Sequence, residues 1–518
     1  MLPIASLVDK VPFSAITVSM GSIALAALIV LLVQFRNETT DNDSAKSKLR
    51  KTHSPDTTLP RLENTLTTIR AACDGNLHDR AVEICSQFNG EPILFRSIGM
   101  PDKLVVSTPE VFDDVLKQQF SNFPKGSYMR QNLKDLLGDG VFAADEDLWK
   151  TASNFFTKTT LRDSITATIQ RHTDASDSGE TLDLFRLFNR FALEVVAEIG
   201  FGVRMGSLDS DEEHPIQKAF NHAQRALLLR FVRPGWFWKI QRWLGVGVEG
   251  EFKHDLKVIN TTVMDIVEKA LARRSSNNSD NANDILSLIL DNVGSSPNAD
   301  KQQFDPVFLR DIAVMFLVAG RDTVAQTLSW LYLMLSKNTY WEVAIRSEML
   351  QKTVILKPDA TDITIEDVDQ LVALEAVLME SLRLHPPVPM IPKYVEKDTT
   401  LADGTFVEAN SLVVLATYAM ARMEQVWGPD AAEFKPLRWI DSSSGWAEIA
   451  PSKFRLYLGM DLVMSEMKLV MAGLLTKFHI EVQDLKKVAH DVSLTLPVKG
   501  SLDAKIIRCT YSKLPKHS

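Results

Sequence analysis

Two adjacent residues, Asp322 and Thr323, combine a carboxylate with a hydroxyl in the middle of a strongly apolar segment. Such a pair can relay protons in a site that excludes water. A buried acid is costly unless it is paired, so an acid at this position requires a reason. The alternative is purely structural: the acid bonds a neighbouring residue, and the threonine donates a hydrogen bond back to its own helix.

The segment that carries this pair is predicted to be one long buried helix. Asp305-Pro306 is a strong helix start, because it places an N-cap residue before a proline at the first helical position. The helical pattern then continues to about residues 337–338 without another proline. About 30 residues at 1.5 Å each give roughly 45 Å, enough to cross a whole domain. Residues 312–318 are apolar on most faces, which indicates burial.

A second group of charged residues has a spacing typical of a structural cluster. Glu380 and Arg383 stand three positions apart near a predicted helix end, so they share a face and can pair. Exposed pairs of this kind are common and contribute little on their own. Arg438, within the run 436–439, could complete a Glu–Arg–Arg cluster with them.

The rest of the chain is predicted to be mainly α-helical with a minor β-sheet. Strand signals are few: residues 93–98 form one candidate, and residues 405–417, after an Asp-Gly turn, form another. The polar run 273–283 is predicted to be an exposed loop. The composition, 45% hydrophobic and 24% charged residues, is that of a globular chain that buries a large core.

Charge and cysteine content exclude two classes of protein. The net charge of −9 argues against a nucleic-acid-binding protein, which should carry a basic face. Three cysteines are too few for a disulfide scaffold, and their spacing is not that of a metal site.

The N-terminus is predicted to anchor the chain in a membrane. Residues 11–33 carry no charge, and about 20 apolar residues suffice to cross a bilayer as a helix. Basic residues follow this run, which predicts a single-pass protein whose bulk is cytosolic. The predicted organisation is an anchor at 1–36, a linker at 37–60 and a main domain at 61–518. A cleaved signal sequence is the alternative, although the run is long for one.

Taken together, the motifs resemble those of the cytochrome P450 family. Residues 319–323 resemble its oxygen-binding helix motif, and Glu380, Arg383 and Arg438 resemble its structural cluster. Gly459, at the start of a helix predicted to reach about Thr476, resembles the stretch that follows the haem ligand. The order of the three motifs fits the family over roughly residues 60–510. The runs 319–330 and 380–389 look most like the branch that oxidises fatty acids near the ω end.

The resemblance implies a P450-like fold and a haem-dependent monooxygenase acting on a long apolar substrate such as a fatty acid. Heme b would be its cofactor, and NADPH would supply electrons through a membrane-bound cytochrome P450 reductase. Asp322 would be the relay acid and Thr323 the hydrogen-bonding alcohol, with Ala319 beside the haem. Gly320 would leave room for oxygen and substrate. The expected location is the endoplasmic reticulum membrane.

The haem-ligand segment departs from the family pattern Phe-x-x-Gly-x-Arg-x-Cys-x-Gly. The chain has Phe454 and then Gly459, with Tyr457 in the place of the cysteine. Phe454 and Tyr457 are only three positions apart, so four residues of the pattern are missing. Cys509 lies 52 positions beyond Tyr457 and is no substitute. No metal-ligating cysteine is therefore predicted, although tyrosine does ligate haem iron in catalase.

A second departure concerns the family's Trp-x-x-x-Arg motif, whose two residues help to hold a haem propionate. Trp149 is present, but Ser153 stands where the arginine is expected. Lys393, after a proline-rich turn, is expected to serve as a propionate partner.

Three explanations of the two departures remain open: a wrongly placed exon boundary in the translated gene, a decayed copy, or a haem protein with another axial ligand. They leave two functions to distinguish. One is the monooxygenase. The other is a catalytically inactive membrane protein of the same fold that binds lipid or a partner. A helical membrane protein with accidental motif matches is a remote third.

Overall fold

The computed structural model describes residues 53, 60–138, 158–209, 212–276, 284–294, 305–353, 363–441 and 460–509. The predicted anchor at 11–33 and nearly all of the predicted linker lie outside these ranges. Among the described residues, no helix combines the length and the apolar character needed to cross a membrane.

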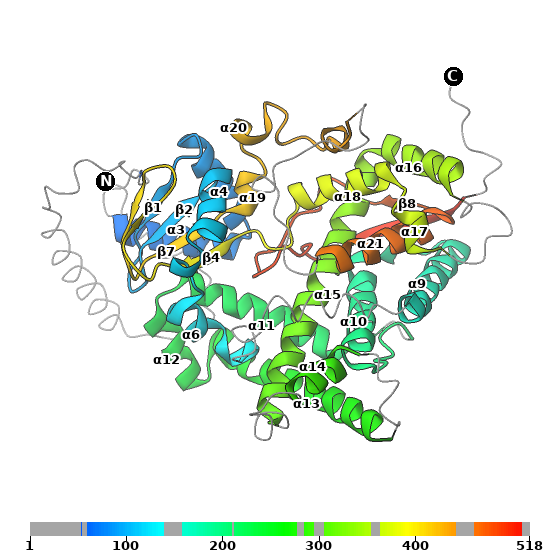
Figure 1. The fold of residues 1–518 in the computed structure, drawn as a ribbon, viewed down its shortest axis with the longest axis horizontal. Coiled ribbons are helices and arrows are strands. Elements are labelled where there is room, and N and C mark those ends of the chain that lie inside the picture. Colours follow the sequence, from blue (N-terminus) through cyan, green and yellow to red (C-terminus); the bar gives the residue numbers. More distant parts are fainter. Residues whose placement is uncertain are drawn as a thin grey trace, which may run out of the picture. The chain divides into compact units, whose positions relative to one another are not determined.

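Helices make up most of the described chain, as predicted (Figure 1). In chain order they are α3 (Pro60–Asp74), α4 (Leu77–Gln87), α5 (Pro109–Asp113), α6 (Gly126–Leu137), α9 (Lys158–Ser178), α10 (Leu184–Phe201), α11 (Pro215–Val232), α12 (Gly235–Leu244), α13 (Gly247–Ser276), α14 (Ile285–Gly294), α15 (Pro306–Lys337), α16 (Thr339–Lys352), α17 (Ile365–Val368), α18 (Val372–Leu384), α19 (Thr417–Met420), α20 (Glu424–Trp427) and α21 (Met460–Leu475). Short helical turns of other types are η3 (Asp114–Gln118), η4 (Phe120–Asn122) and η6 (Pro436–Trp439).

The strands form small sheets, which confirms the predicted minor β content. They are β1 (Ile93–Phe95), β2 (Lys103–Val106), β3 (Leu182–Asp183), β4 (Ile391–Tyr394), β5 (Thr399–Thr400), β6 (Phe406–Val407), β7 (Leu412–Leu415), β8 (Phe478–Val482) and β9 (Asp503–Arg508). The largest sheet has the order β1-β2-β7-β4, with β2 and β7 parallel. The others have the orders β3-β9-β8 and β5-β6.

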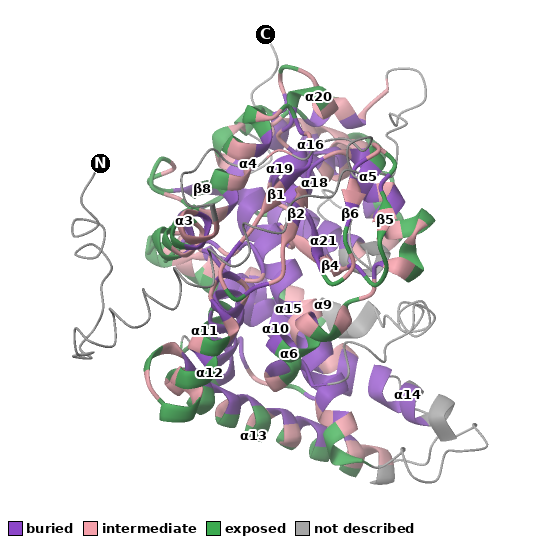
Figure 2. Ribbon diagram, turned by 90° about the vertical axis from the view of Figure 1, so that its left-hand side faces the viewer, coloured by how far each residue is buried: buried purple, intermediate pink, exposed green. Residues whose placement is uncertain are grey.

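Helix α15 lies at the centre of the helical part, as its sequence predicts (Figure 2). The side chain of Asp305 accepts a hydrogen bond from the backbone N–H of Val307, so the predicted N-cap is present. Both ends of α15 contribute to hydrophobic clusters: Val314 packs in one with α11 and α13, and Leu331 in another with α10, α18 and α21. The helix therefore connects the two hydrophobic clusters, and its middle lies where they meet.

The four-stranded sheet positions a lysine beside the segment that precedes α6. Strand β7 is fully buried and apolar, and β4 pairs with it at the edge of the sheet. The edge position accommodates Pro392, which cannot donate to a ladder. The next residue, Lys393, is opposite Val413.

Two sequence predictions needed correction. Residues 273–276 belong to α13 and are not a loop, whereas 277–283 lie outside the described residues. The helix is extended because Arg273 pairs with Asp284, and Arg274 donates to the carbonyl of Ser287 at 2.8 Å. The single strand predicted at 405–417 is two strands, β6 and β7, with Asn410 at a positive φ of 65° between them.

Candidate functional site

The acid and the alcohol of α15 are both buried but point to different partners. Asp322 is 1% exposed and Thr323 is 6% exposed. The Thr323 hydroxyl donates to the carbonyl of Ala319 at 2.7 Å, one turn back on the same helix. Adjacent helical residues project about 100° apart, so Asp322 faces another element. The hydrogen bond of Thr323 to its own helix is the one that the structural alternative predicts.

The carboxylate of Asp322 lies in a polar seam between α15 and α11. Its Oδ1 accepts from Nε of the adjacent Arg321 at 2.7 Å, and its Oδ2 accepts from Nε2 of Gln224 on α11. Arg321 in turn donates to Oδ1 of Asn221 at 2.5 Å. The buried acid is thus paired and hydrogen-bonded, which removes the cost of burying it alone. Sequence reasoning missed the amides of α11, although Gln217, Asn221 and Gln224 share one helical face.

The middle of α15 also contains a close helix contact and a partly exposed stretch. A Cβ at Gly320 would lie 2.4 Å from Cγ2 of Val196, so on that side the glycine admits α10. Residues 318–320 are only partly buried, between fully buried residues on both sides. The described residues therefore do not fully cover this part of the helix. The roles expected of Ala319 and Gly320 beside haem and oxygen stay predictions.

The structure brings Glu380, Arg383 and Arg438 together, although 55 or more positions separate the third from the others. Arg383 makes two hydrogen bonds of 2.8 Å to the two oxygens of Glu380. Arg438 Nε, Trp439 Nε1 and the backbone N–H of Lys435 add bonds of 2.9, 2.9 and 2.8 Å. Burial by itself would raise the pKa of Glu380, but these bonds and the arginine charges lower it overall. The cluster locks the end of α18 to η6.

Lys393 lies beside a second lysine that the sequence did not single out. The backbone N–H of Tyr394 donates to the carbonyl of Pro124 at 2.9 Å, and a Cβ at Gly126 would lie 2.4 Å from Tyr394. This contact fixes Lys125 next to β4. Partial burial lowers the pKa of Lys393, and burial followed by the charge of Lys393 lowers that of Lys125.

Haem, which the resemblance implies, fits one part of this arrangement and not another. Two neighbouring ammonium groups repel each other, and Lys393 has no ion-pair partner among the described residues. An anionic group such as a propionate would relieve that repulsion. The segment 454–459, which resembles the family's haem-ligand segment, contains no cysteine, and the chain's cysteines are Cys73 on α3, the buried Cys85 on α4 and Cys509 after β9. Burial raises the pKa of Cys85 to about 11, which keeps it a thiol.

Three further predicted site residues, Trp149, Tyr457 and Gly459, lie outside the described residues. The helix expected after Gly459 is present as α21, from Met460 to Leu475. The segment predicted to hold the haem ligand, Phe454 to Gly459, lies outside the described residues, so the role of Tyr457 stays a prediction from sequence.

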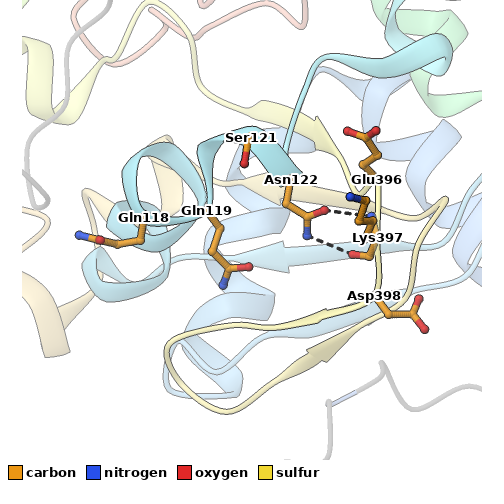
Figure 3. A pocket seen from close by; sticks show the side chains of 7 residues that line it. All are labelled: Gln118, Gln119, Ser121, Asn122, Glu396, Lys397 and Asp398. Atoms are coloured by element: carbon orange, nitrogen blue, oxygen red, sulfur yellow. Dashed lines mark hydrogen bonds between the residues drawn. The ribbon is translucent and has the colours of Figure 1, made fainter.

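An open pocket of about 440 Å³ lies elsewhere, near η3, η4 and the segment after β4 (Figure 3). Asn122 bridges its two sides: its Nδ2 donates to the carbonyl of Lys397, and its Oδ1 accepts from the backbone N–H of Lys397, both at 3.0 Å. The pocket is polar, and none of the predicted site residues lines it. Its lining residues are Gln118, Gln119, Ser121, Asn122, Glu396, Lys397 and Asp398. The predicted proton-relay and haem-binding residues therefore do not belong to this pocket.

Comparison with known proteins agrees with the motifs. The family model for cytochrome P450 matches residues 54–502. Cytochrome P450 86B1 of Arabidopsis thaliana is 32% identical over 478 residues, which cover 86% of this chain and 84% of that protein. Cytochrome P450 CYP94D109 of Paris polyphylla is 31% identical over 454 residues, covering 79% and 86%. Cytochrome P450 94B1 of Arabidopsis thaliana is 31% identical over 435 residues, covering 78% and 82%. The chain therefore belongs to the cytochrome P450 family of monooxygenases.

Proposed function

We propose that the protein is a haem-dependent monooxygenase that hydroxylates a long apolar substrate such as a fatty acid. The observation that carries this proposal is the buried acid and alcohol, Asp322 and Thr323, beside the partly exposed stretch 318–320 of α15. Heme b, when bound, supplies the iron at which O2 is activated. NADPH supplies the electrons through cytochrome P450 reductase.

The roles we assign to individual residues follow from their chemistry. Asp322 holds and passes protons at its carboxylate, and Thr323 orients a hydrogen bond at its hydroxyl. Lys393, with Lys125 beside it, binds a propionate. Trp149, Ala319, Gly320, Tyr457 and Gly459 would contact the cofactor, as the family's motifs imply.

A second candidate is a catalytically inactive membrane protein of the same fold that binds lipid or a partner. The observation that favours it is the sequence itself: Tyr457 stands in the place of the axial cysteine, and Ser153 in the place of the motif's arginine. An iron without its thiolate loses the ligand that favours O–O cleavage in this family.

One experiment separates the two candidates. The full chain is expressed with a haem supply, and haem per chain, the spectrum of the reduced carbon monoxide complex and hydroxylation of fatty acids with reductase are measured. Near-stoichiometric haem together with hydroxylated product supports the monooxygenase, and the spectrum of the reduced carbon monoxide complex reports which kind of ligand binds the iron. Absence of haem supports the second candidate. Thr323→Val should reduce turnover about 100-fold, whereas Thr327→Val, a back-bonded threonine one turn further along α15, is the matched control.

We also propose that the protein resides at the endoplasmic reticulum membrane with its main domain in the cytosol. Helix α12 supports contact with lipid, because its outer face exposes Trp236, Ile240, Trp243 and Leu244, of which Trp243 is 84% exposed. Its inner face is fixed by Trp238, whose ring lies 4.1 Å from the guanidinium of Arg230. An amphipathic helix with outward tryptophans is typical of a segment that lies in a membrane interface.

In vesicles that contain brominated lipid, part of the tryptophan fluorescence of the full chain should be quenched. Trp236→Phe/Trp243→Phe should lose most of the quenched fraction, because bromine quenches only rings that reach the lipid. The predicted anchor contains no tryptophan and so contributes no signal. Trp341→Phe, a buried position on α16, is the control. Equal quenching in the double variant and the unmodified chain would contradict contact between α12 and lipid.

A further inference from the structure

A chain of buried hydrogen bonds connects Asp322 to a segment about 170 positions away. Gln224 on α11 donates through Nε2 to Oδ2 of Asp322. Thr495 lies in the segment before β9, and its hydroxyl donates to Oε1 of Gln224 at 3.2 Å. Gln326, one turn beyond Asp322 on α15, donates through Nε2 to that hydroxyl at 2.7 Å. All four side chains are at most 9% exposed.

The donors and acceptors of this chain all run in one direction. Oε1 of Gln326 accepts from the backbone N–H of Leu496 at 2.9 Å, so its amide orientation is fixed by a backbone group. That orientation requires Nε2 of Gln326 to face Thr495, whose hydroxyl hydrogen then points to Gln224. The carbonyl of Leu496 also accepts from Nε1 of Trp330 on α15 at 2.8 Å. Each amide is therefore held at both ends, and the chain terminates on a carboxylate, where a hydrogen bond is strongest.

The chain decides which way the carboxylate of Asp322 faces. Its Oδ1 is bound by Arg321, which belongs to the same helix and moves with it. Its Oδ2 is bound by Gln224, which belongs to α11. Without Gln224 the carboxylate could turn about its side-chain torsions, because Thr323 is occupied by the Ala319 carbonyl and does not bind it. A buried carboxylate oxygen with no donor is costly, so loss of Gln224 forces a new orientation.

We infer that Gln224 is a positioning residue for Asp322, and that Thr495 and Gln326 hold Gln224 in the required amide orientation. The catalytic meaning of this placement rests on the proposed function, whereas the placement itself does not require a bound cofactor. It follows that the carboxylate of Asp322 takes this orientation only when α11 and the segment around Thr495 are both packed against α15. A shift of either segment reaches Asp322 through one or two hydrogen bonds.

The test uses infrared spectra of the full chain labelled with carboxyl-¹³C aspartate. The difference between the unmodified chain and Asp322→Asn isolates the carboxylate band of Asp322. That band should shift in Gln224→Leu and should shift less in Thr495→Val. In Thr495→Ser, which keeps the hydroxyl, the band should stay at the position that it has in the unmodified chain. Gln217→Leu is the matched control: it lies on the same face of α11, is 1% exposed, and neither atom of its amide bonds any described group.

The outcomes separate this inference from the proposed function. An unchanged Asp322 band in Gln224→Leu, or an equal shift in Gln217→Leu, overturns the inference whether or not the protein turns over substrate. A shifted band in a chain without haem or product supports the positioning role and rejects the monooxygenase. In an active protein, Gln224→Leu should lower kcat about tenfold with little change in KM. An equal loss in Gln217→Leu would reduce the role of Gln224 to packing.

Discussion

Glu380→Gln should lower the free energy of unfolding by about 3–5 kcal/mol, the usual cost of removing one partner from a buried ion pair. Glu380 is 0% exposed and accepts bonds from both Arg383 and Arg438. The uncharged glutamine side chain cannot neutralise two guanidinium groups. Its NH₂ group would also donate toward N–H groups of the arginines, which are donors themselves. Because typical stabilities are about 5–15 kcal/mol, the variant should be largely unfolded at moderate urea concentrations. Urea unfolding followed by circular dichroism measures the change.

The control for Glu380→Gln is Asp484→Asn. Asp484 and Lys487 form an ion pair with the same three-residue spacing, but their side chains are 69% and 79% exposed. Its loss should change the free energy of unfolding by less than about 0.5 kcal/mol. Equal effects of the two substitutions would show that the buried cluster contributes no more than a surface pair.

Glu466→Gln should stabilise the protein, with an effect that grows as pH rises. Glu466 lies on α21, its Oε1 has no hydrogen-bond partner among the described residues, and burial raises its pKa from 4.5 to about 8. Below about pH 4.5 the acid is neutral in both states and costs nothing. Between pH 4.5 and about 8 only the unfolded chain ionises, so stability is progressively lost as pH rises. Near neutral pH the gain from glutamine should be about 3 kcal/mol.

Urea unfolding of both proteins at several values between pH 4.5 and 8.5 measures this difference. The two curves should converge at the acid end and separate toward pH 8. Glu481→Gln, at an exposed position of β8, is the control and should shift stability by less than about 0.5 kcal/mol. A constant difference between Glu466→Gln and the unmodified protein at every pH would mean that Glu466 is not the titrating group.

Local patterns sufficed for the elements that carry the motifs. Helix α15 begins after Asp305 as predicted, because an N-cap and a following proline act within one turn of the chain. The same is true of the end of α18 before His385 and its two prolines. The prediction was wrong for residues 273–276 because their helical state depends on bonds to Asp284 and Ser287, which a local pattern does not contain.

The sites differ in how far the sequence could predict them. The cluster at Glu380 could be anticipated because charged residues in an apolar helix require partners of opposite charge. The position of Lys125 could not be anticipated, because it lies beside Lys393 only through the hydrogen bond between Tyr394 and Pro124, which are 270 positions apart in the chain. Nor does the sequence state that Gln224, Thr495 and Gln326 meet: three amide or hydroxyl side chains in different segments are ordinary surface residues until the fold buries them together.

Residue identity alone established that α15 carries an acid and an alcohol in an apolar setting, and that the segment 454–459, which ends at Gly459, contains no cysteine. Those facts depend only on which residues are present and how they are spaced. The directions of the two side chains depend on packing: Asp322 meets α11 through Gln224, while Thr323 turns back to Ala319. A hydrogen bond acts over about 3 Å, so its partner is chosen by how helices dock and not by their order in the chain.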